Sequence, residues 1–398
     1  MPTSGTTADV NVILQTLNQN LKVLGDIEAP LYSRYAGGSA LNTSTDGKFE
    51  WLSKTLKGQK DTVNTAITSA GTTTLVVNSG TSSGLKQYIT DTEAKTYIIV
   101  RNVGTGAEEI MKVTANTPST NTSSLTVVRG ALGTTALSAI PANSEVRLLP
   151  ATVGEASDIT GNHAEYSSKL YNYIQDFHAS IILSERMQNA NSVAQETTLK
   201  RQLAERSAVI LKQVQTAFIG GQRFSGTGEA SKPLTLSGGL KWWANDQGNS
   251  TFKGNSALTF KDLDTIAIQM MNNGVMNSNL DLILSPAQAQ RLYALKEARI
   301  VGGGVQQSNN TMTNYMGRYE FTPDYGFNLM MSTDLFDDEL IILDKSRVMI
   351  SQQKAGEFLK ADPLAKSGNY DQTFIRGALG FKVQSPKETL FHLKGLAV

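Results

Sequence analysis

The stretch VAQETTLKRQLAERSAVILKQVQTAFIGG, residues 193–221, sets the architecture of the chain because it predicts one long helix. Apolar residues recur at spacings of four and seven, so they share one helical face. They are Leu199, Leu203, Ile210, Val214 and Phe218. Gly220-Gly221 is a typical stop signal, and Glu196 and Lys200 are ordered for an i,i+4 ion pair. At 1.5 Å per residue such a helix spans roughly 40 Å.

Upstream of this helix, residues 71–150 consist of short β-branched runs separated by Gly, Asn, Ser and Pro clusters. Strands at this spacing are typical of a small all-β module, either a barrel or a sandwich. Segments of helical character flank the module on both sides, so we expect it to be an insertion. The predicted strands are Thr72–Val77, Thr96–Val103, Glu108–Thr117, Ser123–Arg129 and Ser144–Leu149.

The N-terminal region predicts a helix followed by extended chain. Thr7 is a suitable N-cap and Gly25 a suitable stop, and an apolar stripe lies between them. The stripe consists of Val10, Ile13, Leu14, Leu17, Leu21 and Leu24. Two interpretations stay open: a helix docked on the chain's own domain, or an arm lying on a neighbouring subunit. Residues 26–60, which contain Gly37-Gly38, are predicted to be extended and loop-like.

Downstream of the long helix the pattern is α+β. A helix is predicted from Thr259, and a buried strand at Leu280–Leu284 precedes a second helix that runs to about Ala298. Ser285 is the N-cap of this second helix, and Gln288 completes a capping box. The core face of the first helix is Leu263, Ile266, Ala267, Met270 and Met271. Later strands are Glu339–Leu343, Arg347–Ser351, Thr373–Val383 and Leu390–Leu396, with a turn at Ser385–Glu388 that predicts a closing hairpin.

Composition excludes several classes of function. The 398 residues are 40% hydrophobic but only 18% charged, with a net charge of +1. Neighbours can cover such a surface at low desolvation cost, and bulk charge indicates no nucleic-acid or membrane partner. The absence of Cys excludes disulfides, thiolate metal sites and a Cys nucleophile. No apolar run reaches the roughly 20 residues that span a bilayer, and no signal peptide is evident.

No motif predicts catalysis, a cofactor or a metal. Gly226-Thr-Gly228 lacks the third glycine of a dinucleotide site. The pairs Glu108-Glu109 and Asp337-Asp338 are predicted to lie in solvated turns, and neighbouring residues on a strand point to opposite faces. Trp242-Trp243 predicts a strand with one ring inside and one at a subunit contact, and His178 a packing histidine. We therefore expect no catalytic, cofactor-binding or metal-binding residues and no enzyme activity.

The order of these parts resembles the major capsid proteins of tailed bacteriophages with the Hong Kong 97 fold, in a branch with a β-rich insertion domain. Several stretches are similar to family signatures: the Pro-Leu and Glu-Trp motifs, the return strand of the extended loop, the spine helix and the recurrent β module. They are Glu28–Tyr32, Phe49–Leu52, Tyr171–Phe177, Leu199–Phe218, Glu109–Ala115 and Leu125–Ala136.

The resemblance implies an α+β capsid fold with a division of labour. The implied ranges are an N-terminal arm at 1–51, an extended loop at 52–70 and 151–192, an all-β insertion domain at 71–150, a peripheral domain with the spine helix at 193–254 and 346–398, and an axial domain at 255–345. The loop Gly302–Asn314 would be the tip that faces the symmetry axes.

The resemblance also implies a structural protein that self-assembles into an icosahedral or prolate head enclosing double-stranded DNA. Its partners would be copies of itself in pentamers and hexamers, decoration, portal and scaffolding proteins, and packaged DNA held by non-specific contacts, with no membrane partner. It would be assembled in the bacterial host cytoplasm and located in the virion.

Two other functions remain as alternatives. An encapsulin-like compartment would use the same fold to hold cargo enzymes, and it would need a groove for a cargo peptide. A tail or baseplate adhesin is suggested by the β module alone, although adhesins are typically trimeric and β-rich throughout. Negative-stain microscopy separates shells from trimers, and packaged DNA separates a phage head from a compartment.

Overall fold

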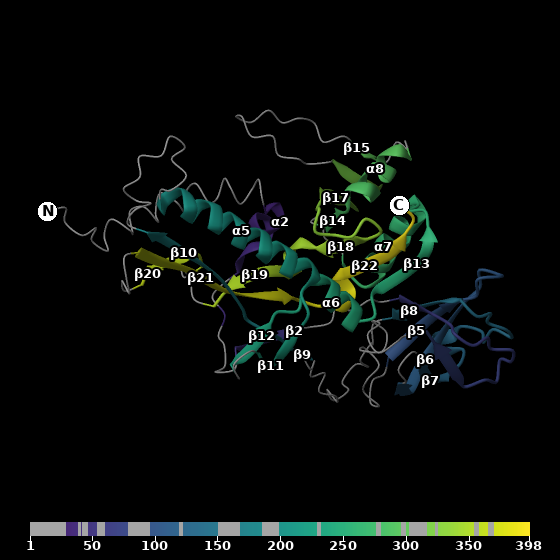
Figure 1. Cartoon of the computed structure of the whole chain (residues 1–398). Coiled ribbons are helices and arrows are strands. Elements are labelled where there is room, and N and C mark those ends of the chain that lie inside the picture. Colours follow the sequence, from purple (N-terminus) through teal and green to yellow (C-terminus); the bar gives the residue numbers. More distant parts are fainter. Residues whose placement is uncertain are drawn as a thin grey trace. The chain divides into compact units, whose positions relative to one another are not determined.

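The computed structural model describes residues 29–38, 41, 47–53, 60–78, 96–118, 122–149, 168–184, 199–228, 232–275, 280–295, 300–301, 317–322, 325–353, 358–364 and 370–398. The chain divides into two compact units (Figure 1). Unit 1 comprises Met1–Ser53, Lys169–Thr259 and Asn277–Val398, and unit 2 comprises Lys54–Ser168 and Phe260–Met276. The predicted helix after Thr7, the Glu196–Lys200 side-chain pair and the loop Gly302–Asn314 lie outside the described residues.

Helix α5, Leu199–Gly220, is the long helix that the sequence predicts, and it ends at the expected glycine pair. Leu203, Ile210, Val214 and Phe218 are buried, which confirms their shared face. The helix packs on strand β10 and on the short helix α2, Pro30–Tyr35. The prediction of extended chain over residues 26–60 was wrong at α2. Pro30 there fixes the first helical turn, and Leu31 and Tyr35 are buried.

Below α5 lies a five-stranded sheet in the order β1-β19-β21-β10, with β20 also paired to β21. Its longest strand pairing joins β10 to β21 antiparallel, from Gln175 opposite Leu379 to Ser184 opposite Tyr370. The bounds are β1 Ala36–Gly38, β10 Gln175–Ser184, β19 Val348–Gln352, β20 Lys360–Pro363 and β21 Tyr370–Val383.

The described part of unit 1 also contains a seven-stranded sheet in the order β13-β22-β18-β14-β17-β16-β15. Strands β14 and β18 at its centre are buried along their whole length, as the continuous apolar runs of their sequences predict. The bounds are β13 Ser250–Ser256, β14 Leu280–Leu284, β15 Ile300–Val301, β16 Arg318–Thr322, β17 Tyr325–Met331, β18 Leu340–Asp344 and β22 Leu390–Leu396. Helix α8, Pro286–Ala294, follows β14.

Smaller elements complete unit 1. Strand β2 pairs with β9, and β11 pairs with β12. Their bounds are β2 Lys48–Ser53, β9 Ser168–Tyr173, β11 Phe224–Thr227 and β12 Pro233–Leu236. Helix α6 covers Leu240–Asp246, the 3-10 turn η3 covers Lys345–Arg347, and the one-turn helix α9 covers Pro386–Thr389.

Three local predictions for unit 1 were wrong. Strands β21 and β22 do not form a hairpin, because α9 carries the chain from the five-stranded sheet into the seven-stranded one. Trp242 and Trp243 lie in helix α6 rather than in a strand. Ser285 caps α8 as predicted, but the Gln288 amide donates to the carbonyl oxygens of Asp337 and Ala397 instead of closing a capping box.

Unit 2 contains the small all-β module. Its sheet runs β3-β8-β5-β6-β7-β4, and a bridge from Val63 to Val77 joins the two ends of this order. The sheet therefore closes on itself around one apolar core, which includes Val63, Met111 and Leu125. The bounds are β3 Lys60–Thr62, β4 Thr74–Val77, β5 Thr96–Arg101, β6 Glu108–Pro118, β7 Ser123–Val128 and β8 Glu145–Leu149, with the 3-10 turn η1 at Ala131–Gly133.

Each strand predicted for the module is confirmed, although β3 precedes residue 71, at which the module was expected to begin. Unit 2 also includes helix α7, Phe260–Asn272. Leu263, Ile266, Ala267 and Met270 are buried on its core face as predicted, whereas Met271 is only half-buried.

Candidate subunit interface

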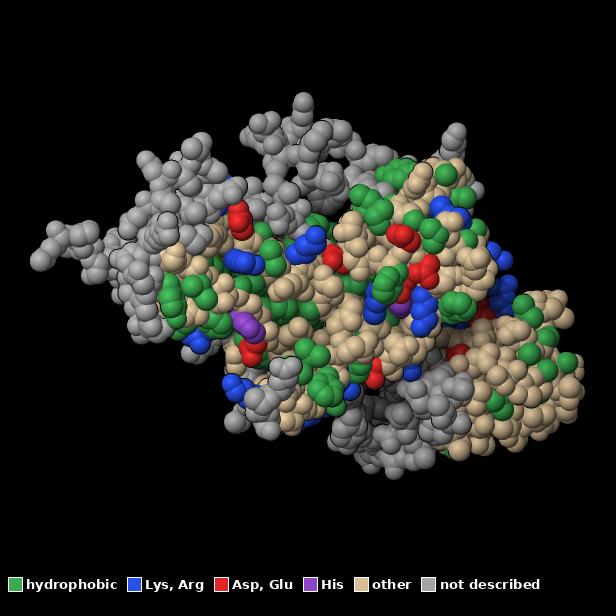
Figure 2. All heavy atoms as spheres, viewed as in Figure 1, with side chains coloured by type: hydrophobic (Ala, Val, Ile, Leu, Met, Phe, Trp, Pro, Cys, Tyr) green, Lys and Arg blue, Asp and Glu red, His purple; other side chains and the backbone are tan. Residues whose placement is uncertain are grey.

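The surface has few charges for its size. Figure 2 shows hydrophobic side chains scattered over a face that is mostly uncharged, with Lys, Arg, Asp and Glu side chains thinly spread between them. Apolar side chains in the described residues that are more than half exposed include Leu52, Phe252, Phe336 and Val398 in unit 1, and Val103 and Leu132 in unit 2. Because exposed aromatic and aliphatic side chains are enriched where proteins associate, these positions are the candidates for subunit contacts.

The first candidate is the ribbon formed by β2 and β9. Its inner face is fixed to the body, since Trp51 is buried and its indole nitrogen donates to the Val383 carbonyl oxygen at 3.2 Å. The Tyr171 ring lies between the Lys48 ammonium, at 4.3 Å, and the Arg223 guanidinium, at 4.2 Å from the ring centroid. On the other side of the ribbon the Leu52 side chain is 70% exposed.

Arg223 links this ribbon to α6. Its guanidinium lies 4.0 Å from the centre of the Trp242 ring and donates to the Tyr171 carbonyl oxygen at 3.2 Å. Cation–π contacts of this kind contribute up to about 2 kcal/mol when they are shielded from water. The ribbon is therefore held rigidly at its base, and its exposed side is presented in a fixed orientation.

The second candidate is a patch around the C-terminus, formed by Phe252, Phe336 and Val398. The two phenylalanines are each 70% exposed and Val398 is 66% exposed. Asp338, in the turn after Phe336, accepts a hydrogen bond from the Gly395 amide through its carboxylate at 3.1 Å. The Phe252 ring lies over the α-carbon of Gly395. These contacts place Phe252 and Asp338 at Gly395 in β22, and Phe336 and Val398 lie within three residues of Asp338 and Gly395 in the sequence.

Charged groups beneath this patch are paired. The Lys241 ammonium forms an ion pair with Glu339 and lies 4.4 Å from the Phe336 ring centroid. His392, 4% exposed, faces Glu339 on one side and Ser250 on the other, with its Nδ1 3.1 Å from the Ser250 hydroxyl oxygen. Burial raises the pKa of Glu339, but hydrogen bonds from His392 and Lys241 outweigh burial and leave the pKa below its usual value.

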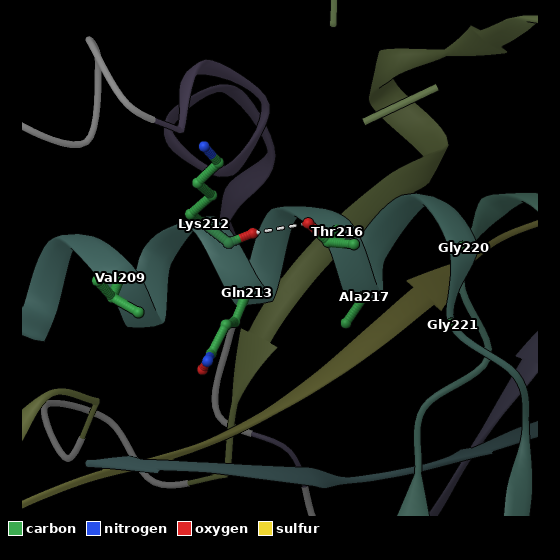
Figure 3. A pocket seen from close by; sticks show the side chains of 7 residues that line it. All are labelled: Val209, Lys212, Gln213, Thr216, Ala217, Gly220 and Gly221. Carbon is green, nitrogen blue, oxygen red and sulfur yellow. Dashed lines mark hydrogen bonds between the residues drawn. The ribbon is translucent and has the colours of Figure 1, made fainter. Parts of the chain in front are cut away.

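The third candidate is a hollow of about 580 Å³ along the outer side of α5. Figure 3 shows the side chains of Val209, Gln213 and Ala217 along one side of the helix and those of Lys212 and Thr216 along the other. The end of the hollow is backbone, at Gly220 and Gly221. Because Lys and Gln present aliphatic stems to such a surface, most of the lining is apolar.

A hairpin next to this helix adds two exposed apolar residues. Strands β11 and β12 pair antiparallel, with Phe224 opposite Leu236. Phe224 is 46% exposed and Leu234 is 43% exposed. No residue of the hairpin is fully buried in its described part. A two-stranded ribbon of this kind has little core of its own and is stabilised by whatever covers it.

Buried ionic groups serve the fold rather than the surface. Asp281 is fully buried and accepts two hydrogen bonds from the Arg34 guanidinium, at 2.5 and 2.6 Å, and one from the Tyr35 hydroxyl at 2.6 Å. Burial and the nearby Asp281 carboxylate raise the pKa of Tyr35 well above its usual value. These bonds fix α2 to β14, since a buried charge must be paired.

The prediction of a solvated turn was wrong for Glu108 and Glu109, since both lie in strand β6. Glu108 is exposed and Glu109 is fully buried, so the two point to opposite faces as predicted. The Glu109 carboxylate pairs with Arg129 and accepts hydrogen bonds from the Gly130 and Leu137 amides, both at 2.9 Å. The alternation of side chains along a strand could have predicted the burial of Glu109, because Glu109 shares its strand face with Met111, which is buried.

The other candidates are placed as follows. Asp337 and Asp338 lie in the predicted turn before β18. Trp243 is fully buried and Trp242 half-buried, as expected for one inner and one outer ring, although both lie on a helix. His178 is exposed on β10, and its ring packs against that of Phe374 at 5.7 Å between ring centroids.

No chemistry beyond contact is assembled at these places. Gly226 and Gly228 lie in and directly after β11, away from the start of a helix. Within the described residues, no three His, Asp or Glu side chains lie close enough together to hold a metal ion. No helix in the same residues combines the length and the apolar character that crossing a membrane requires.

Comparison with known proteins identifies a family. A family model described as SU10 major capsid protein matches residues 2–397. No curated protein matches the chain. Among solved structures it is similar to the holo-SrpI encapsulin complex from Synechococcus elongatus PCC 7942, with 12% identity, a TM-score of 0.42, and coverage of 58% of this chain and 78% of that one. It is also similar to the capsid of cyanophage A-1(L), with 9% identity, a TM-score of 0.41, and coverage of 63% of this chain and 85% of that one. It is also similar to a structure of Mycobacterium phage Patience, with 10% identity, a TM-score of 0.38, and coverage of 63% of this chain and 78% of that one.

Proposed function

The chain belongs to the SU10 major capsid protein family and is a major capsid protein of a phage head, and from this premise we propose how its parts build the shell. The observation that carries the assignment is the match of the family model to residues 2–397, which is nearly the whole chain. Copies of a capsid protein assemble with one another, and this one is a structural component of the virion with no enzymatic role.

The proposed shell is an icosahedral or prolate head of the Hong Kong 97 type, built from pentamers and hexamers around double-stranded DNA. The low charge of the surface supports it, because uncharged surface is covered by neighbouring subunits at little desolvation cost. So do the exposed apolar side chains at Leu52, Phe252 and Phe336, which contact between copies would shield from water. Many weak contacts in a closed symmetric assembly reinforce one another.

In the proposed division of labour, ribbon β2–β9 is the base of the extended loop, because the β-rich module lies between these strands in the sequence. Helix α5 and the five-stranded sheet form the peripheral domain. The seven-stranded sheet forms the axial domain and takes in β13 and β22, which the sequence-based ranges leave mostly to the peripheral domain. The closed sheet of unit 2 is the insertion domain.

Further partners belong to the same proposal. Packaged DNA would meet Lys and Arg side chains of the inner wall through its phosphates, without sequence preference and with strong salt dependence. Decoration, portal and scaffolding proteins would bind the assembled shell, and no membrane takes part. A gel shift that favoured one DNA sequence over shuffled competitors would contradict the DNA component.

Microscopy of the purified protein tests the function directly. We expect closed shells in negative stain, with nuclease-protected DNA inside particles taken from infected cells. A truncation lacking residues 1–25 should stay soluble but form no closed shells, whereas one lacking only residues 1–6, which precede the apolar stripe, should assemble normally. Trimers or small oligomers of the full chain would refute the proposal, and normal shells from the longer truncation would refute the role of the arm.

A further inference from the structure

The hollow on α5 has the character of a docking site for an apolar helix face. Val209 is 48% exposed at the end of the hollow opposite Gly220 and Gly221 (Figure 3), although other residues of α5 pack on β10. Nothing lies within 4 Å of the position that a β-carbon would take at Gly220, so that end of the hollow is open. A hollow of this size along a helix is complementary to the side chains of a second helix packed against it.

The described chain begins against α5, where it contacts buried residues on the body-facing side of the helix and not the lining of the hollow. Ala29 is fully buried, and the Leu31 amide donates to the Gln215 side-chain oxygen of α5 at 3.2 Å. The Tyr35 and Phe218 rings lie 5.3 Å apart, which holds α2 against the same helix. Figure 3 shows the ribbon of this N-terminal part beside Lys212. Ala29 and Leu31 therefore lie on the side of α5 that adjoins Lys212, which is about one helical turn from Gln215.

The sequence before Ala29 contains a segment of matching chemistry. Residues 7–24 carry an apolar stripe at helical spacing, with Leu14, Leu17 and Leu21 at its middle. Four residues, 25–28, lie between Leu24 and Ala29, so the α-carbons of Leu24 and Ala29 can be at most roughly 17 Å apart. Asp26 and Glu28 lie in this connection.

The charges of the two parts are complementary. Among the described residues that line the hollow, Lys212 alone is charged, and the Asp334 carboxylate accepts a hydrogen bond from the lining residue Thr216 at 2.8 Å. Because Asp26 and Glu28 directly precede the anchored Ala29, they are placed to neutralise Lys212 once the segment turns back along α5.

We propose that residues 7–24 fold back as a helix and occupy the hollow on α5 of their own chain. This inference rests on the proposed function and deepens it, because it assigns to the N-terminal arm a specific binding site on its own subunit. The same chain is favoured over a neighbour because a tether of four residues gives a local concentration on the order of millimolar.

Engineered disulfides test this without background, since the chain contains no Cys. Gln213→Cys in the hollow is combined in turn with Leu14→Cys, Leu17→Cys and Leu21→Cys in the full-length protein. Gln19→Cys is the matched control, because it lies on the opposite face of the same predicted helix. After mild oxidation the products are separated on non-reducing gels, and the linked peptides are identified by mass spectrometry.

We expect at least one apolar-face pair to form an intramolecular disulfide, at several times the yield of the Gln19 pair and unchanged over about 100-fold dilution, as a tethered reaction requires. Equal yields from the two faces, or bands only at the size of dimers and larger, would overturn the inference. Tryptophan fluorescence of each variant establishes that unit 1 is folded.

Failure of this inference and failure of the proposed function give different results. If the wild-type protein forms shells but the apolar-face pairs do not crosslink within one chain, the binding site on α5 is refuted and the capsid function stands. If no shells form at all, the proposed function fails, and the disulfide pattern of the isolated subunit still decides where the segment lies.

Discussion

The buried ion pair between Glu109 and Arg129 should control the stability of the β module. The Glu109 side chain is fully buried and that of Arg129 is 6% exposed. The guanidinium donates to the two carboxylate oxygens at 2.7 and 2.6 Å and to the Leu137 carbonyl oxygen at 2.8 Å. The carboxylate also accepts from the Gly130 amide, so this pair joins β6 to the turn that follows β7.

Glu109→Gln removes the negative charge at nearly constant volume and leaves a buried guanidinium uncompensated. Breaking such a pair from one side costs about 3–5 kcal/mol. Opening of the module should then be favoured by about 100-fold or more, since 1.4 kcal/mol corresponds to a factor of ten. Glu108→Gln is the matched control, because its side chain is 59% exposed and its nearest oxygen lies 3.9 Å from Arg101. That change should alter stability by less than about 1 kcal/mol.

Hydrogen exchange separates the two units in this measurement. The chain has three Trp residues, at positions 51, 242 and 243, and all of them lie in unit 1. Glu109→Gln should therefore speed the exchange of β6 and β7 amides while Trp fluorescence under urea stays unchanged. Replacing both partners, with Glu109→Leu and Arg129→Met, should recover part of the loss. Exchange in Glu109→Gln no faster than in Glu108→Gln would refute the reasoning.

Three further outcomes follow from other buried contacts. Burial raises the pKa of Glu388 from 4.5 to about 7, so the folded state binds the proton more tightly than the unfolded state does. The free energy of unfolding should therefore fall by about 3 kcal/mol as pH rises from 4.5 through 7. Glu388→Gln should remove this pH dependence in urea titrations at several pH values. Gly395→Ala places a β-carbon against the Phe252 ring at a φ of +70°, so it should lower the thermal midpoint by several degrees, and Phe252→Ala should restore part of it. Asp281→Asn leaves the Arg34 charge uncompensated and should cost about 3 kcal/mol in a urea titration followed by Trp fluorescence, with little dependence on salt.

The elements that local sequence could predict were those with many repeats of one pattern. The strands of the β module alternate apolar and polar residues between clusters of turn residues, and each was placed correctly. Helix α5 runs through six turns with one apolar face, and its glycine stop is where the sequence puts it. In both cases the periodicity of the residues equals the periodicity of the backbone, so no information from distant parts of the chain is needed.

What could not be predicted depends on partners that are distant in sequence. Helix α6 is seven residues long, too short for a periodic signal, and it exists because Trp243 is buried against the body. The expected hairpin of β21 and β22 failed because β21 pairs with β10, β19 and β20 instead. The short connection between β21 and β22 favours a hairpin. Each strand instead buries its residues in a different sheet, and α9 carries the chain from one sheet to the other.

The candidate interface divides in the same way. Low charge and abundant uncharged polar residues identified a surface to be covered, which is a property of composition. The side chains that are candidates for the contacts were missed, because exposure of Phe252 or Phe336 is decided by the fold of the turns around β22 and has no local pattern. Arg223 was missed for a related reason, since its stacking partners Tyr171 and Trp242 come from two other elements.

The core of unit 1 constrains where the subunit can adapt to its neighbours. One apolar cluster contains Phe177 and Phe381 of the five-stranded sheet, Ile341 and Leu390 of the seven-stranded sheet, and Phe218 of α5. Because close-packed interiors resist deformation, the two sheets should move as one body when copies meet at different angles. Adaptation then falls to two-stranded ribbons with little core of their own, such as the hairpin β11–β12. Variants that stiffen these ribbons should therefore change the sizes of the assembled particles while leaving subunit stability unchanged, whereas core variants should do the reverse.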